Sequence, residues 1–178
     1  RTLVISAGVI MNMLFAFGAY TFLAAGYGVQ EIASTRVGMV VAESLPPGTE
    51  AMGTIEPGSR IVRIGGEPTE HWGDVASQLL EGDAGPVLVE LVEPIRSIEI
   101  RIPVSDQERR ALVGSLAVWI DAGIGYAETG SPAHEAGLEA GDRVVAVAGE
   151  PVDSWWKFRD AIASRPGERV EVTIEREG

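Results

Sequence analysis

Residues 58–72 read GSRIVRIGGEPTEHW, and residues 141–155 read GDRVVAVAGEPVDSW. At this constant offset of 83, seven of the fifteen positions are identical. The similarity continues into an apolar pattern with the i, i+3, i+7 spacing of one helix face, formed first by Trp72, Val75 and Leu79 and then by Trp155, Phe158 and Ile162. Repetition at a fixed period indicates that one structural unit occurs twice in this chain.

Each copy is expected to fold as strand, turn, strand, helix and strand. Alternating apolar residues mark the strands, and Gly65-Gly66 permits a tight turn in the first copy. The first copy predicts strands Val37–Ala42 and Arg60–Ile64, helix Trp72–Leu80, and a hairpin of Val87–Val92 and Ser97–Ile102 around Glu93-Pro94. The second predicts strands Val118–Ile120, Gly123–Ala127, Arg143–Val147 and Val170–Glu175. We therefore expect domains at residues 31–105 and 113–178, the second without its closing strand, and a polar linker at 106–112.

The N-terminal residues predict a transmembrane helix over residues 1–30. No charged residue occurs from Thr2 to Gln30, and Leu3–Gly28 is almost wholly apolar or small. About 20 apolar residues cross a bilayer, whereas a signal peptide has an apolar core of about 7–15. Arg1 precedes the segment and the acidic residues follow it, so the positive-inside rule favours an extracytoplasmic C-terminal part.

Composition excludes several classes of protein. The 178 residues include 26 acidic and 14 basic side chains, a net charge of −12, which opposes nucleic-acid binding. Cysteine is absent, so disulfides, thiolate zinc sites and cysteine nucleophiles are impossible within this chain. His71 and His134 are the sole histidines, too few for a multi-histidine metal site, and both are expected to be surface or cap residues.

The second copy resembles the PDZ-domain signature, and the first copy is similar but weaker. The resemblance is carried by Gly130-Ser131-Pro132-Ala133, Ala136-Gly137-Leu138, Ala140-Gly141-Asp142-Arg143 and Val147-Ala148-Gly149. It implies two α+β PDZ domains, each a small, partly open β-barrel with a groove helix that binds extended peptides. The implied peptide-binding residues of the second copy are Gly114, Ser115, Leu116, Ala117 and Val118 in the carboxylate-binding loop, and Trp155, Phe158 and Ile162 on the helix. Ala117 replaces a glycine of the family's loop.

The order of parts, a membrane helix followed directly by tandem PDZ modules, resembles the site-2 intramembrane zinc proteases of the regulator of sigma-E protease type. Asn12 in the segment Ala7–Met13 matches the asparagine of a helix motif in that family, and Gly8, Asn12 and Ala16 share one helix face. The resemblance implies that the chain is an internal piece of a membrane metalloendopeptidase that uses Zn²⁺. It also implies that this piece has no catalytic or metal-binding residue and is inactive alone, because it contains no His-Glu-x-x-His.

That family further implies a role and a location for the chain. The tandem PDZ pair gates access for transmembrane substrate proteins that a prior protease has trimmed. The complete protein would be a multi-pass protein of the cell inner membrane, in contact with the lipid bilayer, with periplasmic PDZ domains and no nucleic-acid partner.

Two alternatives are weighed against this reading. A membrane-anchored serine protease of the high-temperature-requirement type would carry its protease domain between helix and PDZ domain, where only Val29–Arg36 lies here. A membrane-anchored tandem-PDZ scaffold or secretion component without protease activity fits these residues equally. The segment upstream of Arg1 discriminates: a start methionine favours the scaffold, and a metal-binding helix favours the protease.

The asparagine of the N-terminal helix generates the first prediction. Substituting Asn12→Leu in the complete protein should lower cleavage of its membrane substrate, because the helix is expected to lie beside the site where the substrate is cut. Cleavage by detergent-solubilised enzyme, followed on gels, measures the effect. Unchanged cleavage would reduce Asn12 to a helix-packing residue.

Overall fold

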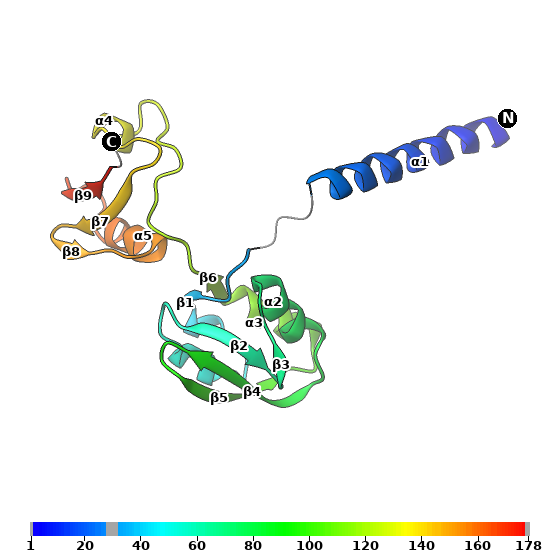
Figure 1. The fold of residues 1–178 in the computed structure, drawn as a ribbon, viewed down its shortest axis with the longest axis horizontal. Helices are drawn as coiled ribbons and strands as arrows, with labels where there is room; N and C mark the ends of the chain where they lie inside the picture. The colour runs from blue at the N-terminus through cyan, green and yellow to red at the C-terminus, as the bar shows by residue number, and fades with distance from the viewer. Residues whose placement is uncertain (1, 28–31, 177–178) are drawn as a thin grey trace. The chain divides into compact units, whose positions relative to one another are not determined.

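The computed structural model of the chain describes residues 2–27 and 32–176, and within the first helix it describes the side chains of residues 8–23 and 26 (Figure 1). The chain divides into two compact units, residues 1–32 and residues 33–178. Helix α1 (Thr2–Tyr27) belongs to the first unit. Within the second unit, residues 33–118 are called the first lobe and residues 119–176 the second lobe.

Helix α1 covers most of the uncharged N-terminal segment, so a helix forms where the sequence predicts one. Its described apolar side chains are largely exposed, among them Phe15 and Phe22. Within the described residues, however, no helix is both long enough and apolar enough to cross a membrane, and the predicted membrane span is not confirmed. Residues 1 and 28–30 of the predicted segment lie outside the described residues.

The first lobe combines a β-sheet, a β-ribbon and helices. The sheet has the antiparallel order β3-β2-β4-β5, and β1 pairs with β6 in the ribbon. Its strands are β1 (Val37–Val40), β2 (Arg60–Ile64), β3 (Glu67–Pro68), β4 (Gly85–Val92), β5 (Arg96–Ile102) and β6 (Leu116–Val118). Its helices are η1 (Ala42–Ser44), η2 (Glu50–Thr54), α2 (Trp72–Glu81) and α3 (Asp106–Gly114). These bounds confirm the strand, helix and hairpin predictions for the first copy to within two residues at each end.

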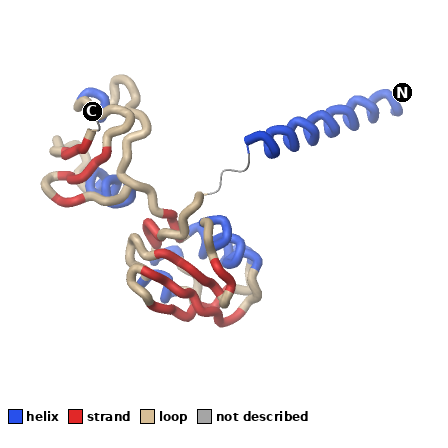
Figure 2. Tube along the Cα trace, viewed as in Figure 1, coloured by secondary structure: helices blue, strands red, loops and turns tan. Residues whose placement is uncertain are grey.

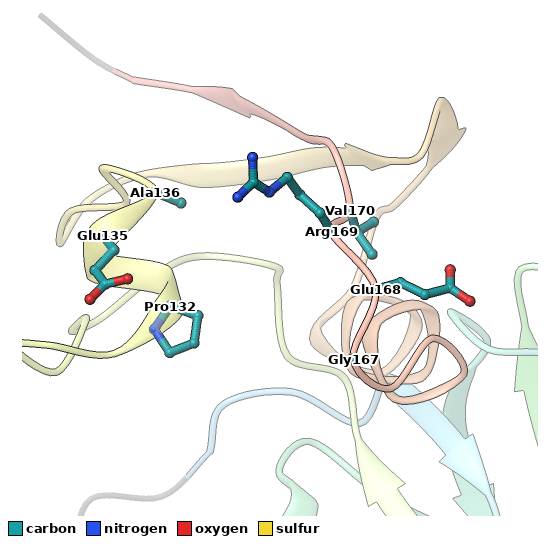
Figure 3. Close-up of a pocket in the computed structure, with 7 residues that line it drawn as sticks. All are labelled: Pro132, Glu135, Ala136, Gly167, Glu168, Arg169 and Val170. Atoms are coloured by element: carbon teal, nitrogen blue, oxygen red, sulfur yellow. The ribbon is translucent and has the colours of Figure 1, made fainter.

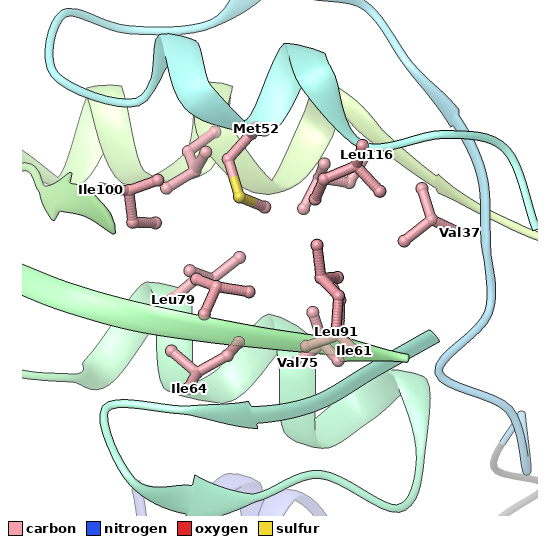
Figure 4. Close-up of a cluster of buried hydrophobic side chains, with 12 residues drawn as sticks. Val37, Met52, Ile61, Ile64, Val75, Leu79, Leu91, Ile100 and Leu116 are labelled. Carbon is pink, nitrogen blue, oxygen red and sulfur yellow. The ribbon is translucent and has the colours of Figure 1, made fainter. Parts of the chain in front are cut away.

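The core of the first lobe lies between the sheet, the ribbon and the helices (Figure 4). Every major element contributes at least one buried apolar side chain, as in Val37, Met52, Ile61, Leu79, Leu91, Ile100, Leu112 and Leu116. Val75 and Leu79 are the buried residues of α2, which follows from the apolar face that the sequence pattern predicts.

Helix α3 replaces the predicted linker of residues 106–112. Leu112 is completely buried in the first lobe, and α3 packs beside α2 (Figure 1). Ser105 followed by Glu108 has the spacing of an N-terminal helix signal, although the Ser105 side chain makes no cap hydrogen bond. The sequence predicted a linker because most residues of this segment are charged or polar. The one apolar face of the helix, which contains Leu112, is too short to stand out in the sequence.

The buried guanidinium of Arg109 ties α3 to the end of α2. Its Nε donates to Pro103 O at 2.7 Å, and its Nη1 donates to Leu80 O at 2.8 Å and Gly82 O at 2.6 Å. Carbonyls at a helix C-terminus lack partners within the helix, so a cation placed there satisfies them. Arg109 therefore ties α3 both to the residues just before it and to the end of α2, 27–29 residues earlier in the chain.

The second lobe repeats part of this architecture. Its sheet has the order β8-β7-β9, with β7 (Arg143–Val147), β8 (Glu150–Pro151) and β9 (Val172–Glu175), and its helices are α4 (Pro132–Glu135) and α5 (Trp155–Ala163). Its buried core is smaller, with Ala122, Val144, Val147 and Val152. Loops make up most of residues 119–142 (Figure 2).

Equivalent backbone hydrogen bonds occur in both lobes, so the sequence repeat is also a structural repeat. In the first lobe the bonds run from Val37 N to Ser59 O (2.7 Å), from Gly58 N to Val37 O (2.7 Å) and from Ile61 N to Thr35 O (3.1 Å). The second lobe has the same bonds from Ile124 N to Asp142 O (2.7 Å), from Gly141 N to Ile124 O (2.8 Å) and from Val144 N to Ala122 O (2.8 Å). Equivalent residues of the two lobes are 83 positions apart from residue 58 onward and 87 positions apart at residues 35 and 37. The segment between residues 37 and 58 is therefore four residues longer than its counterpart in the second lobe.

The tight turn is repeated as well. Gly65 and Gly66 have φ of 61° and 89°, and the equivalent residues Ala148 and Gly149 have φ of 50° and 81°. Ala148 thus occupies a left-handed conformation that the glycine of the first copy adopts without steric cost. The first turn connects β2 to β3 and the second connects the equivalent strands β7 and β8, so the backbone conformation of the turn is repeated too.

The predicted strand Gly123–Ala127 is not formed; the structure has only an isolated bridge between Gly123 and Arg143 there. Its first-lobe counterpart, β1, is a strand because β6 pairs with its other side. Within the described residues no strand pairs in this way with 124–127. The predicted strand Val118–Ile120 also differs, since β6 ends at Val118 and belongs to the first lobe. Residues 177–178 lie outside the described residues.

The Arg109 contacts generate a stability prediction. Arg109→Met should lower the free energy of unfolding by roughly 2–4 kcal/mol, because three carbonyls lose a charged donor in a buried place. Urea denaturation of the full chain measures this, with Arg110→Met on the exposed side of α3 as the matched control. Equal losses of unfolding free energy for the two variants would show that the Arg109 contacts do not stabilise the packing of α3 on the first lobe.

Candidate functional site

A narrow apolar cleft lies between α2 and β6 in the first lobe. The space between the two elements is too narrow to admit a water molecule, and it is lined by Trp72, Val75, Ala76, Leu79, Val113 and Leu116. Val75, Leu79 and Leu116 also belong to the core, so the floor of the cleft is fixed by the packing of the lobe. A helix and a strand edge enclosing an apolar cleft are the parts that strand-addition peptide sites use.

The edge of β6 that faces away from β1 supplies main-chain groups to this cleft. Ser115 O accepts from Val41 N and Trp119 N donates to Arg36 O, both at 2.8 Å, so these residues point toward β1. Backbone groups alternate along an antiparallel strand, so those of Leu116 point away from β1, whereas Val118 O lies close to Gly38 of β1 and accepts from Trp156 Nε1 at 2.8 Å. This edge can pair with an additional strand.

The loop before β6 is poorly arranged to capture a C-terminal carboxylate. The amide of Ser115 already donates to Ala111 O at 2.9 Å and Leu112 O at 3.2 Å, and its hydroxyl donates to Leu112 O. The loop also follows the C-terminus of α3, where the helix dipole is negative and repels an anion. The geometry therefore favours an internal extended segment over a free chain end.

The structure separates the predicted peptide-binding residues. Gly114, Ser115, Leu116, Ala117 and Val118 lie at the end of α3 and in β6 of the first lobe, where Leu116 lines the cleft beside α2. Trp155, Phe158 and Ile162 lie on α5 of the second lobe. There the rings of Trp155 and Phe158 are 5.5 Å apart, and Phe158 packs against the small core. The sequence prediction paired this loop with α5, whereas the structure pairs it with α2.

The other residues that the sequence analysis singled out lie on the protein surface or at a helix end. Gly8 and Asn12 are exposed on α1, and a Cβ added at Gly8 would meet no atom within 4 Å. His71 is the N-cap residue of α2 and His134 is exposed in α4, as predicted. The backbone N–H groups of His71 and Glu70 donate to Asp74 Oδ2, both at 2.8 Å, and lower the pKa of the Asp74 carboxyl.

A wider hollow lies in the second lobe between α4 and the segment before β9. It has a volume of about 720 Å³ and is lined by Pro132, Glu135, Ala136, Gly167, Glu168, Arg169 and Val170. Figure 3 shows the side chain of Arg169 reaching toward α4 while that of Glu168 points away. Charges of both signs line this hollow, so it selects no ligand of a definite charge.

A buried carboxylate closes the second lobe. Asp142 is 1% exposed and accepts from Arg176 Nε at 2.5 Å, from Arg176 Nη2 at 2.8 Å and from Glu139 N at 2.7 Å. The paired guanidinium of Arg176, followed by the Glu139 amide, lowers the pKa of the Asp142 carboxyl to about 2. The equivalent residue of the first lobe is Ser59, which is equally buried and carries no charge.

Comparison with known proteins identifies the second lobe. The family model of the PDZ domain matches residues 123–176, so a PDZ domain is present in the second lobe. The match begins at residue 123 and not at the predicted residue 113, in agreement with the position of residues 113–118 in the first lobe.

The whole chain also resembles complete proteins. It is 28% identical to the regulator of sigma-E protease RseP of Salmonella typhimurium and 29% identical to that of Escherichia coli, in each case over its full length. The chain is similar over its whole length to regulator of sigma-E proteases. A Neisseria meningitidis protein with zinc metalloprotease in its name is 28% identical over the same range. The chain spans 41% of the length of each of these relatives.

The Asp142–Arg176 pair predicts acid sensitivity of the second lobe. Because the folded-state pKa is lowered from 3.8 to about 2, the pair contributes its full stabilisation above about pH 4 and loses it as the pH falls toward 2. The protection factors for hydrogen exchange at amides of residues 139–144, which correct for the pH dependence of intrinsic exchange, should therefore fall over this range in the full chain. Arg176→Gln should weaken the pH dependence, whereas Glu139→Gln, at an exposed partner of Arg176, should keep it. Identical profiles for wild type and Arg176→Gln would contradict this account.

Proposed function

We propose that this chain is the non-catalytic, substrate-gating part of a membrane zinc metalloprotease that performs regulated intramembrane proteolysis. Full-length similarity to the regulator of sigma-E proteases is the observation that carries the proposal. The cleft between α2 and β6 supports it, because a protease that selects among protein substrates needs a site for an extended chain. In this view residues 33–176 select substrates and other parts of the protein cut them.

The first lobe is proposed to be a second PDZ domain. It shares with the PDZ-matched second lobe the repeated sequence, the same backbone hydrogen bonds and the same left-handed turn. It also contains a strand, β6, beside a groove helix, α2, which are the elements that PDZ domains use to bind peptides. A tandem pair of PDZ domains then follows α1 in the sequence.

The cleft is proposed to bind an extended, apolar internal segment of the substrate as a strand added to β6. Main-chain groups of Leu116 would supply the hydrogen bonds, and the space between α2 and β6 would have to widen to receive one apolar side chain. A bulky folded domain hinders such an approach, whereas a trimmed substrate presents an extended stub. Strand addition thereby discriminates in favour of trimmed transmembrane substrates.

Zinc is proposed to be held outside the described part of this chain. Among the described residues no group of three or more His, Cys, Asp or Glu side chains could hold a metal ion, so these residues do not fit a zinc site. Structural and catalytic zinc sites need three or four such ligands. The residues described here would contribute to the reaction only by binding and orienting the substrate.

The membrane placement is also a proposal. The described side chains of α1 are mostly apolar and mostly exposed, and such a helix needs a cover of lipid or of other helices. We propose that α1 contacts lipid and neighbouring helices in a multi-pass inner-membrane protein, with both lobes in the periplasm. Gly8 and Asn12 would face those helices.

Filling the cleft tests the proposed function. Ala76→Phe in the complete protein should raise KM for a trimmed membrane substrate roughly five- to tenfold with little change in kcat, because the ring occupies the space that the substrate segment needs. Ser77→Phe is the matched control, since it adds the same ring at the next, exposed position of α2. Cleavage of a purified fluorescent substrate in detergent measures both constants.

Three outcomes would contradict the proposal. Equal KM values for the two variants would remove the cleft from substrate binding. Equal cleavage of trimmed and untrimmed substrates by wild type would remove the gating role. No cleavage by the wild-type complete protein would favour the alternative of an anchored tandem-PDZ scaffold.

A further inference from the structure

A three-residue segment, residues 119–121, connects β6 of the first lobe to the rest of the second lobe and is called the joint. The backbone N–H of Trp119 donates to Arg36 O at 2.8 Å, so the joint begins as a continuation of the β1–β6 ribbon. Ile120 O accepts from the backbone N–H of Trp155, the first residue of α5, at 2.8 Å. The joint is thus bonded to the first lobe at one residue and to α5 of the second lobe at the next.

The side chain of Trp119 is also held against the first lobe. The guanidinium of Arg36 lies 3.9 Å from the centroid of the Trp119 ring, and its Nε donates to Gly58 O at 3.0 Å. The indole Nε1 of Trp119 donates to Asp121 Oδ1 at 3.1 Å. A cation over an aromatic face is an attractive contact. These contacts oppose rotation of the chain at the joint.

Trp156 of α5 makes a second connection between the lobes. Its indole Nε1 donates to Val118 O, in the last residue of β6, at 2.8 Å. Arg159 lies over the Trp156 ring at 5.0 Å from its centroid, and its Nη2 lies 3.5 Å from Met39 Sδ of β1. Residues three apart share one helix face, so one face of α5 contacts both strands of the ribbon.

Gly38 of β1 makes room for this contact. A Cβ added there would overlap Trp156 Nε1 and lie 2.5 Å from Val118 O, closer than real Cβ atoms come to such neighbours. The pairing register of β1 with β6 shifts between Val37 and Met39, so Gly38 lies at an irregularity of the ribbon. A glycine in a strand often marks a close approach by another group. The indole and the end of β6 meet here because β1 has no side chain at this position.

We propose that the joint and Trp156 hold the two lobes in one fixed orientation, so that residues 33–176 move as one body. Domains joined by a small interface normally move relative to each other, and this chain opposes that motion with contacts on both sides of the connection. In the proposed gating part, a substrate then meets both lobes in a preset arrangement. The inference itself depends neither on that gating role nor on peptide binding in the cleft between α2 and β6.

Distances between spin labels on the two lobes are the first measurement. The chain has no cysteine, so Glu99→Cys in the first lobe and Glu168→Cys in the second give one labelled pair at exposed positions of the full chain in detergent. Double electron–electron resonance should show a narrow distance distribution. Trp156→Phe, which keeps a ring and removes the donor, should roughly double its width, because relative motion is the default across a small interface. Gly38→Ala should also broaden it, because the added methyl group displaces the indole.

Matched controls separate loss of the contact from a general effect of substitution. Trp155→Phe makes the same change one residue earlier in α5, where the ring packs against Phe158 of the same lobe. Gly73→Ala adds a methyl group in α2, where a Cβ would meet no atom within 4 Å. Both controls should keep the narrow distribution. A broad distribution for wild type, or equal widths for wild type, Trp156→Phe and Gly38→Ala, would overturn the proposal.

Cleavage within the joint is the second measurement. Chymotrypsin cuts after aromatic residues, and a cut between Trp119 and Ile120 requires the joint to open locally. Loss of the Trp156 hydrogen bond should raise the initial rate of this cut in the full chain roughly three- to tenfold, as followed by mass spectrometry. Trp155→Phe should be cut there at the wild-type rate. Equal rates for wild type and Trp156→Phe would contradict the proposed role of Trp156.

Discussion

The pairing of β6 with β1 is the contact on which the first lobe depends. Helix α3 connects β5 to β6 in the sequence, yet β6 pairs with β1, the first strand of the lobe, and not with β5. This pairing draws residues 106–118 into the lobe, buries Leu112 and Leu116, and places Arg109 against the end of α2. Backbone pairing and apolar burial act together here, since neither a three-residue strand nor a nine-residue helix is stable alone.

The two lobes share a backbone unit but differ in how that unit is completed. Each has the same turn, the same bulged strand pair and the same contacts to the preceding segment. The first lobe closes with β5, α3 and β6 around a large apolar core. The described part of the second lobe has a smaller core and relies on the charged pair of Asp142 and Arg176, where the first lobe has the neutral Ser59. Stability in acid should therefore differ between two copies of one fold.

A division of labour between the lobes follows from these differences. The cleft between α2 and β6 is lined by residues of the first lobe alone, whereas the second lobe contacts the first through Trp156 of α5, which donates to Val118 O.

The sequence by itself determined the repeat, four strands and helix α2 of the first lobe, and the resemblance to PDZ domains and to regulator of sigma-E proteases. Glycines at the turns and apolar residues at periods of two and 3.6 are local signals, and local signals are readable along a chain. The assignment of residues 114–118 to the first lobe was not readable, because a strand of three residues has no periodicity and its partner, β1, is some 75 residues away. For the same reason no pattern showed that Gly38 leaves room for Trp156. Partner choice between distant segments is decided by the packing of the whole lobe, and that information exists only in the tertiary structure.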